Sequence, residues 1–384
     1  MLPRMESEQR MDRLRQRLAG LGLDGALILY PVDVYYFTGT RQNSALWVPV
    51  DGSPLLMVRK SYDRALKESS VTDVRPFPPS REFASLINGN ARRIGLTFDV
   101  LPVQHYNFYA GLLKGREFAD ISPVNRELRS VKSLWELEQM RMSGVRLAEV
   151  FGKIPGFLRP GMREIDLAAE LEYRLRKAGS SGRFSMRAFG QEIVGLAVAG
   201  ESAAESGCFD GPITGRGLSI ASPYGSSPGI IEGNVPIIVD YAGSFDGYMV
   251  DMTRIFAFGN LSPELEKAFD VAMDIQAWLE DNLTPGPTCE ELYEGAARMA
   301  EQAGLGTYFM GPAKFVGHGV GLELDELPVL ARGFGNPLEA GQTIAIEPKF
   351  VFPGQGAIGI ENTCAVTDAK SERLTKLPDE VIYL

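Results

Sequence analysis

Residues 236–251 read PIIVDYAGSFDGYMVD and contain two strand patterns separated by a turn. The first run is apolar and largely β-branched and ends at Asp240, while the second run follows Asp246-Gly247 and carries Asp251. An Asp-Gly pair between two such runs is typical of a tight β-hairpin. The stretch therefore predicts a hairpin that brings two carboxylates to one place.

Three further candidate ligands follow along the chain. His318 lies in the stretch GHGVG, Glu347 comes just before a proline, and Glu361 follows the apolar stretch IGI. The glycines around the histidine are expected to let the backbone approach a bound group closely. Four carboxylates and one imidazole suit hard or borderline divalent cations. The series therefore predicts a site for two such ions, whose charge would neutralise the carboxylate repulsion.

Composition narrows the classes of protein to consider. A length of 384 residues favours two domains, and 45% hydrophobic with 23% charged residues is typical of globular proteins. The net charge of -10 disfavours a nucleic-acid partner. No apolar run approaches the roughly 20 residues that span a bilayer, and the charged N-terminal helix pattern lacks a signal-peptide core. We therefore expect no membrane association and a cytoplasmic location.

The N-terminal third alternates strand and helix patterns, which predicts an α/β domain over residues 1–125. A second domain is expected over residues 126–384. The predicted strands of the first domain are Ala26–Tyr30, Ser44–Val50, Leu55–Val58 and Arg93–Phe98, and the predicted helices lie near Tyr62–Lys67 and Val103–Leu113.

The second domain has clear helix starts and an internal repetition. Ser133 and Thr288 are each followed three residues later by a glutamate, the pattern of a capping box. Pro160-Gly161 and Pro285-Gly286 each precede an amphipathic helix pattern and then strand-like segments. This repetition predicts two related halves folded face to face.

The motifs around the ligand series resemble those of the pita-bread metallopeptidases, the superfamily of methionine aminopeptidase, aminopeptidase P, prolidase and creatinase. The resemblance covers roughly residues 125–384, and the N-terminal domain is similar to the creatinase-type domain of Xaa-Pro-cleaving members. It implies an α/β creatinase-type domain followed by an α+β pita-bread catalytic domain with two pseudo-symmetric halves. The motifs that carry it are VDYAG (239–243), GY (247–248), DMTR (251–254), GHGVGLE (317–323), IEP (346–348) and GIENT (359–363).

The resemblance also implies a mechanism. Two metal ions, Mn²⁺ first with Co²⁺, Zn²⁺ or Fe²⁺ as alternatives, would share a hydroxide that attacks the peptide carbonyl. Glu347 would be both a ligand and the general base. The implied substrate is a small peptide with proline at the second position, and the implied assembly is a homodimer. The implied metal ligands are Asp240, Asp251, His318, Glu347 and Glu361.

The sequence departs from the family pattern at three places. Asp325 stands where family peptidases usually carry a second histidine, and the stretch Ser219–Ser227 lacks another. Gly359 stands where an arginine is often found. The lost histidines would donate to the substrate carbonyl, a contribution worth about 100-fold to 1,000-fold in rate. Asp325 is the candidate replacement, with Tyr248 or Arg187 as other donors; a solvated loop carboxylate is the alternative interpretation of Asp325.

Three hypotheses about function follow. The first is a metal-dependent Xaa-Pro dipeptidase or aminopeptidase. The second is a non-peptidase hydrolase or lyase on the same fold, similar to the family's dimethylsulfoniopropionate-cleaving members. The third is a binding protein without turnover, which the complete ligand series disfavours. His105, the only other histidine of the chain, is expected to lie outside the site.

Overall fold

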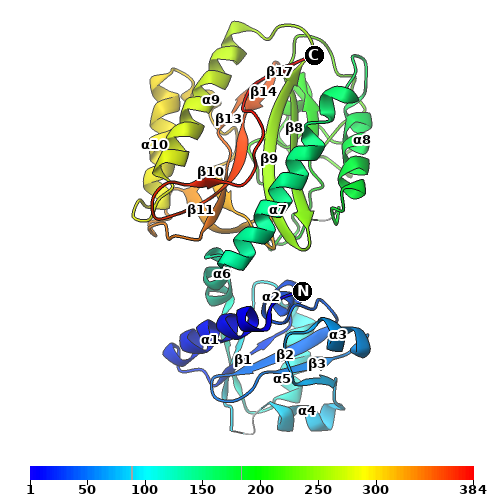
Figure 1. Cartoon of the computed structure of the whole chain (residues 1–384), viewed down its shortest axis with the longest axis vertical. Helices are drawn as coiled ribbons and strands as arrows, with labels where there is room; N and C mark the ends of the chain where they lie inside the picture. Colours follow the sequence, from blue (N-terminus) through cyan, green and yellow to red (C-terminus); the bar gives the residue numbers. More distant parts are fainter. Residues whose placement is uncertain (88–89, 183) are drawn as a thin grey trace. The chain divides into compact units, whose positions relative to one another are not determined.

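A computed structural model describes residues 1–87, 90–182 and 184–384. The chain divides into two compact units, Met1–Arg129 and Ser130–Leu384 (Figure 1). The predicted boundary near residue 125 falls inside helix α6 (Ser122–Ser130). No helix in the described part of the chain is both long and apolar enough to cross a bilayer.

The first unit is an α/β domain, as predicted. Its six-stranded sheet has the order β4-β3-β2-β1-β5-β6, and Leu27 of β1 and Trp47 of β2 belong to its buried core. The predicted strands and helices are confirmed, with ends shifted by at most a few residues. The strands are β1 (Gly25–Ile28), β2 (Ser44–Pro49), β3 (Leu55–Val58), β4 (Val74–Pro76), β5 (Arg93–Leu96) and β6 (Glu117–Asp120). The helices before α6 are α1 (Arg4–Gly20), α2 (Pro31–Thr38), α3 (Tyr62–Glu68), α4 (Ser80–Leu86) and α5 (Val103–Leu112).

The second unit is built on one large sheet of mostly antiparallel strands, in the order β11-β10-β12-β15-β9-β8-β7. Two short strands extend it, β16 beside β15 and β17 beside β9, and β13 and β14 form a separate ribbon. The strands are β7 (Leu196–Ala199), β8 (Ile237–Phe245), β9 (Tyr248–Ala257), β10 (Phe315–Gly319), β11 (Glu326–Ala331), β12 (Thr343–Ile346), β13 (Lys349–Phe352), β14 (Gly356–Gly359), β15 (Glu361–Ala365), β16 (Glu372–Arg373) and β17 (Ile382–Tyr383).

Two pairs of long helices accompany this sheet. The first pair is α7 (Leu134–Phe151) and α8 (Glu164–Lys177), and the second is α9 (Pro263–Asn282) and α10 (Cys289–Gln302). Both predicted capping boxes are confirmed, at the starts of α7 and α10. Each pair is followed by antiparallel strands, so the order of elements occurs twice and the α+β expectation is confirmed (Figure 1). The described residues of this unit also form three short 3₁₀ turns, Ile154–Gly156, Gly200–Ala204 and Gly306–Tyr308.

Helix α7 packs against β8 and β9, the two strands that carry the predicted aspartates. Gly144 lets this helix approach the C-terminal segment very closely. A Cβ atom on Gly144 would lie 2.0 Å from the backbone carbonyl oxygen of Leu374. Since that oxygen belongs to the main chain, it cannot move aside as a flexible side chain would. The glycine therefore allows the close contact between α7 and the C-terminal segment at Leu374.

Gly144→Ala is expected to lower the free energy of unfolding by about 1–3 kcal/mol, because the added methyl forces α7 away from the backbone at Leu374. Alanine ordinarily stabilises a helix relative to glycine by about 1 kcal/mol, so the predicted sign is opposite to the helix propensity. Gly111→Ala in α5 is the matched control, since nothing lies within 4 Å of its Cβ position. Chemical denaturation measures both; equal stability of the two variants contradicts the packing argument.

Candidate metal centre

The β8–β9 hairpin brings the two aspartates together as predicted. Its two-residue turn consists of Asp246 and Gly247, with φ angles of 51° and 92°, the positive values that a type I′ turn requires. The register places Asp240 opposite Thr253. Asp251 lies two residues from Thr253 on the same strand, and therefore on the same face of the sheet. Both carboxylates thus lie on one face of the hairpin.

Strand β15 adds Glu361 to this face. Glu361 pairs with Thr253 from the side of β9 that is opposite to β8. The hydroxyl of Thr253 donates a hydrogen bond of 2.8 Å to Oε2 of Glu361. Asp240 and Glu361 thus flank one threonine in neighbouring strands, and the threonine orients the glutamate.

The remaining two candidates come from β12 and β10. His318 pairs with Ala345, which lies two residues before Glu347, so the imidazole and the second glutamate share a face. All five predicted ligands therefore line one face of five adjacent strands. Asp251, His318 and Glu361 each offer a ligand atom, and these atoms lie within 4.8 Å of one another. Within the described residues, this cluster has the donors and the spacing to hold a divalent ion.

The imidazole of His318 is oriented for metal binding. Its Nδ1 lies 3.1 Å from the carbonyl oxygen of Gly319, so a proton on Nδ1 donates to that carbonyl. This tautomer leaves the lone pair of Nε2 available. Nε2 lies 3.7 Å from Oε1 of Glu347 and 4.0 Å from Oε1 of Glu361. These separations leave room for an ion between the nitrogen and the two oxygens.

One residue of the site was missed by the sequence analysis. Lys349 of β13 places its ammonium among the carboxylates, with its side chain only 1% exposed. Its Nζ donates to Asp240 Oδ2 at 2.8 Å, Glu347 Oε2 at 2.7 Å and Glu361 Oε2 at 2.9 Å. The available signal was a lysine in the otherwise apolar strand KFVF, two positions after a predicted ligand. Burial lowers the pKa of Lys349, but the three carboxylates outweigh it and hold that pKa well above its ordinary value.

The pKa values of Asp240 and Asp251 are both raised, because the attraction of Lys349 does not offset the effect of burial. Burial raises the pKa of Asp251 well above its usual range, and the carboxylates of Glu361 and Asp240 raise it further. Burial also raises the pKa of Asp240, against the opposing effect of Lys349. Carboxylates that repel one another in this way become stable as anions when a further cation lies between them. The electrostatics of the site therefore favour metal binding beside Asp251.

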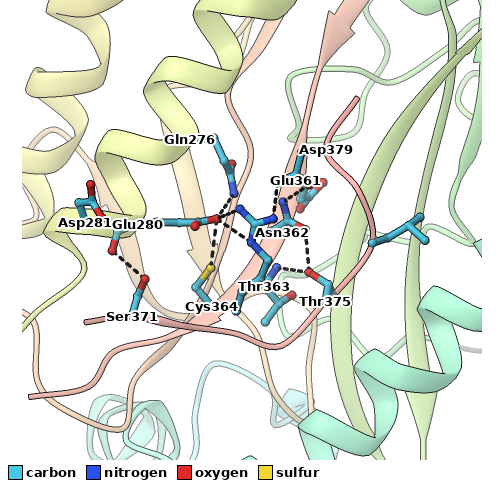
Figure 2. Close-up of polar contacts among 12 residues, drawn as sticks. Gln276, Glu280, Asp281, Glu361, Asn362, Thr363, Cys364, Ser371, Thr375 and Asp379 are labelled. Carbon is cyan, nitrogen blue, oxygen red and sulfur yellow. Dashed lines mark hydrogen bonds and ion pairs between the residues drawn. The ribbon is translucent and has the colours of Figure 1, made fainter. Parts of the chain in front are cut away.

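A network behind the sheet face holds β15 in place. The guanidinium of buried Arg254 donates to the carbonyl oxygens of Thr253 and Glu361, which joins β9 to β15 at the site. Figure 2 shows the next layer, in which the Asn362 amide contacts Asp379 and Thr375. Burial lowers the pKa of Arg254 to about 10. These contacts position Glu361 without using its carboxylate.

The glycines around His318 let neighbouring strands approach closely. A Cβ atom on Gly317 would lie 2.8 Å from the carbonyl oxygen of Ala345 on β12. On Gly319 it would lie 2.2 Å from the carbonyl oxygen of Leu327 on β11. The glycines therefore let two neighbouring strands approach β10, which sets the position of the imidazole. Their close contacts are with backbone atoms. A close approach of the same backbone to a bound group stays a prediction.

Asp325 anchors a loop. Its Oδ1 accepts a hydrogen bond of 2.7 Å from the amide of Arg187, and its Oδ2 accepts one of 2.8 Å from the amide of Ala188. The guanidinium of Arg187 lies 3.5 Å from the Glu323 carboxylate. The Tyr248 hydroxyl donates to Glu136 at the start of α7. A catalytic role for Asp325 stays a prediction, and the contacts show a structural role in addition.

Two family models match the chain. Residues 138–368 match metallopeptidase family M24, and residues 10–131 match the creatinase/prolidase N-terminal domain. The chain belongs to metallopeptidase family M24. The resemblance inferred from the motifs is thereby confirmed, as is the order of a creatinase-type domain before a pita-bread catalytic domain.

Relatives of this M24 chain align over nearly its full length. An uncharacterized peptidase of Bacillus subtilis is 27% identical, and a Xaa-Pro dipeptidase of Pyrococcus furiosus is 26% identical; each alignment covers 98% of this chain and 100% of the relative. The solved structure of a Xaa-Pro dipeptidase from Bacillus anthracis superposes with a TM-score of 0.86 at 24% identity, over 98% of this chain and 100% of that one. This similarity shows the shared fold.

His318→Ala is expected to weaken Mn²⁺ or Co²⁺ binding by at least about 100-fold, because it removes the only nitrogen donor of the cluster. Isothermal titration of the chelator-treated protein measures the affinity. His105→Ala is the matched control: this exposed histidine lies in the first unit and should leave the affinity unchanged. Equal affinity in the two variants contradicts the ligand assignment.

Asp325→Ala is expected to speed hydrogen exchange at the amides of Arg187 and Ala188 by about 10-fold or more, because two charge-assisted hydrogen bonds disappear. Asp325→Asn retains one acceptor oxygen and should give an intermediate effect. Exchange measured by mass spectrometry, together with turnover, separates the roles of this residue. Unchanged exchange with reduced turnover contradicts the structural role and supports a catalytic one.

Proposed function

We propose that this M24 protein is a metal-dependent peptidase that cleaves Xaa-Pro bonds, as a dipeptidase or as an aminopeptidase. The observation that carries the proposal is the cluster of Asp251, His318 and Glu361, whose ligand atoms converge on one face of the central sheet. Full-length similarity to relatives named Xaa-Pro dipeptidase supports the substrate class. Proline at the second position suits a peptidase because its ring is rigid and its nitrogen carries no amide hydrogen.

The chain's own residues prepare the site for hydrolysis. The Gly319 carbonyl fixes the imidazole of His318, and the Thr253 hydroxyl fixes the carboxylate of Glu361. Glu347 is the proposed general base, since its Oε1 faces the same space as Nε2 of His318. A divalent ion held by Asp251, His318 and Glu361 would lower the pKa of bound water towards neutrality and would polarise the peptide carbonyl.

The metal itself is proposed from the donor set. Carboxylate oxygens with one imidazole suit Mn²⁺, and Co²⁺, Zn²⁺ or Fe²⁺ are the alternatives. The resemblance implies a pair of ions at such a site. The homodimer and the cytoplasmic location stay predictions, which rest on the resemblance and on the sequence.

A non-peptidase hydrolase or lyase is the second candidate function. The observation that favours it is the histidine count: His318 is the only histidine in residues 130–384. A site that lacks the usual donors to a peptide carbonyl suits a different substrate better than one that has them. The same assay separates the two candidates.

Protein reloaded with Mn²⁺ or Co²⁺ is expected to release free proline from Xaa-Pro dipeptides, or the N-terminal residue from longer Xaa-Pro peptides. Xaa-Ala peptides should react at least about 10-fold more slowly if a pocket fits the proline ring. Chelator treatment should abolish turnover, and Asp251→Ala should do the same, while His105→Ala retains activity. No turnover across the peptide panel with metal bound contradicts the peptidase proposal and favours the second candidate.

A further inference from the structure

The cluster of carboxylates at the site already surrounds one cation, the ammonium group of Lys349. The Lys349 ammonium has three N–H groups, and three carboxylates accept from it: Asp240, Glu347 and Glu361. The distances of 2.7–2.9 Å are those of charge-assisted hydrogen bonds. The donor capacity of the ammonium is therefore fully used inside the site.

Each of the two glutamates has one carboxylate oxygen near Lys349 and the other near His318. Oε2 of Glu347 and Oε2 of Glu361 both face Lys349. Oε1 of each faces the other way, 3.7 Å and 4.0 Å from Nε2 of His318. The site therefore has two positions for positive charge, one on each side of the glutamates.

Lys349 fills the first of these positions. A divalent ion that bound Asp240 together with the Oε2 atoms would compete for the same oxygen atoms and meet an adjacent positive charge. The second position lies among Asp251, His318 and the Oε1 atoms of the two glutamates. Within the described residues, no lysine or arginine side chain contacts these Oε1 atoms. On this side a divalent ion finds ligand atoms that Lys349 does not already contact.

A glycine on the neighbouring strand leaves space for the side chain of Lys349. Lys349 of β13 pairs with Gly359 of β14. A Cβ atom on Gly359 would lie 2.7 Å from Cα and 2.8 Å from Cγ of Lys349. It would also lie 2.4 Å from the backbone carbonyl oxygen of Pro348, so any larger residue at position 359 would collide with this backbone and with the stem of the lysine. The burial of Lys349 therefore depends on a glycine at position 359.

We propose that the Lys349 ammonium permanently takes the place of one of two metal ions, so that the chain binds a single divalent ion among Asp251, His318, Glu347 and Glu361. This inference deepens the proposed function, because it concerns the same site. The ammonium and one divalent ion together supply three positive charges to four carboxylates. Lys349 then orients both glutamates and supplies the fixed charge that a second ion would provide.

Metal stoichiometry tests the proposal on the full-length protein. Chelator-treated protein is saturated with Mn²⁺ and freed of excess ion, and its metal content is measured by mass spectrometry. The wild-type chain is expected to hold one ion and to give the electron paramagnetic resonance spectrum of an isolated Mn²⁺. Lys349→Ala is expected to hold two ions with a spin-coupled spectrum, because the vacated oxygens become ligands. Lys314→Ala, which removes an exposed lysine of the same unit, should match the wild type.

Each outcome is decisive. Two ions in the wild type, or none, overturn the proposal, as does a folded Lys349→Ala variant that still holds one ion. If that variant does not fold, the wild-type stoichiometry alone decides. The metal stoichiometry can also be distinguished from the test of the proposed function. One ion without peptidase turnover leaves this inference standing and removes the peptidase, and two ions with turnover do the reverse.

Discussion

Carboxylates gathered on one face of a β-sheet must have positive charge beside them. Asp251, Glu347 and Glu361 are all less than 9% exposed, and Asp240 is close by. Burying several anions without partners costs several kcal/mol for each one. The second unit meets this requirement in two ways, with the ammonium of Lys349 on one side and with a space bordered by His318 on the other. The sheet, the ribbon β13–β14 and the packing of α7 all serve to hold these groups in register.

The replacement of an ion by a lysine has chemical consequences. An ammonium carries one charge and donates hydrogen bonds, but it has no open coordination position for water. An ion that activates water therefore has to bind on the side of His318. Lys349 orients the glutamates and balances their charge. From the family resemblance, an arginine was expected at the position of Gly359. Here the positive charge comes from the opposite strand of the ribbon, and Gly359 leaves the space for it.

Much of the site could be predicted from the sequence because its geometry is set by strand register. The Asp-Gly turn fixes the β8–β9 pairing, so the relation of Asp240 to Asp251 follows from local sequence. The order of the motifs and the two capping boxes could be recognised for the same local reasons. The two matched family models agree with this part of the prediction.

What could not be predicted depends on contacts between distant segments. Lys349 looks like a polar residue at the start of a short strand, and only the fold of the β13–β14 ribbon over the sheet places it among three carboxylates. The close contacts of the glycines beside His318 with β11 and β12 could not be predicted either, because these strands come later in the chain. Asp325 was considered as a catalytic or a solvated residue, and its amide contacts with residues 187 and 188 depend on a loop far away in sequence.

Anomalous diffraction from crystals of the full chain grown with Mn²⁺ tests the central claim most directly, because it places each ion and Lys349 in one map. The account predicts a single anomalous peak among Asp251, His318, Glu347 and Glu361, with Nζ of Lys349 still in contact with Asp240. Two peaks in the cluster, with the lysine displaced from the carboxylates, would contradict it.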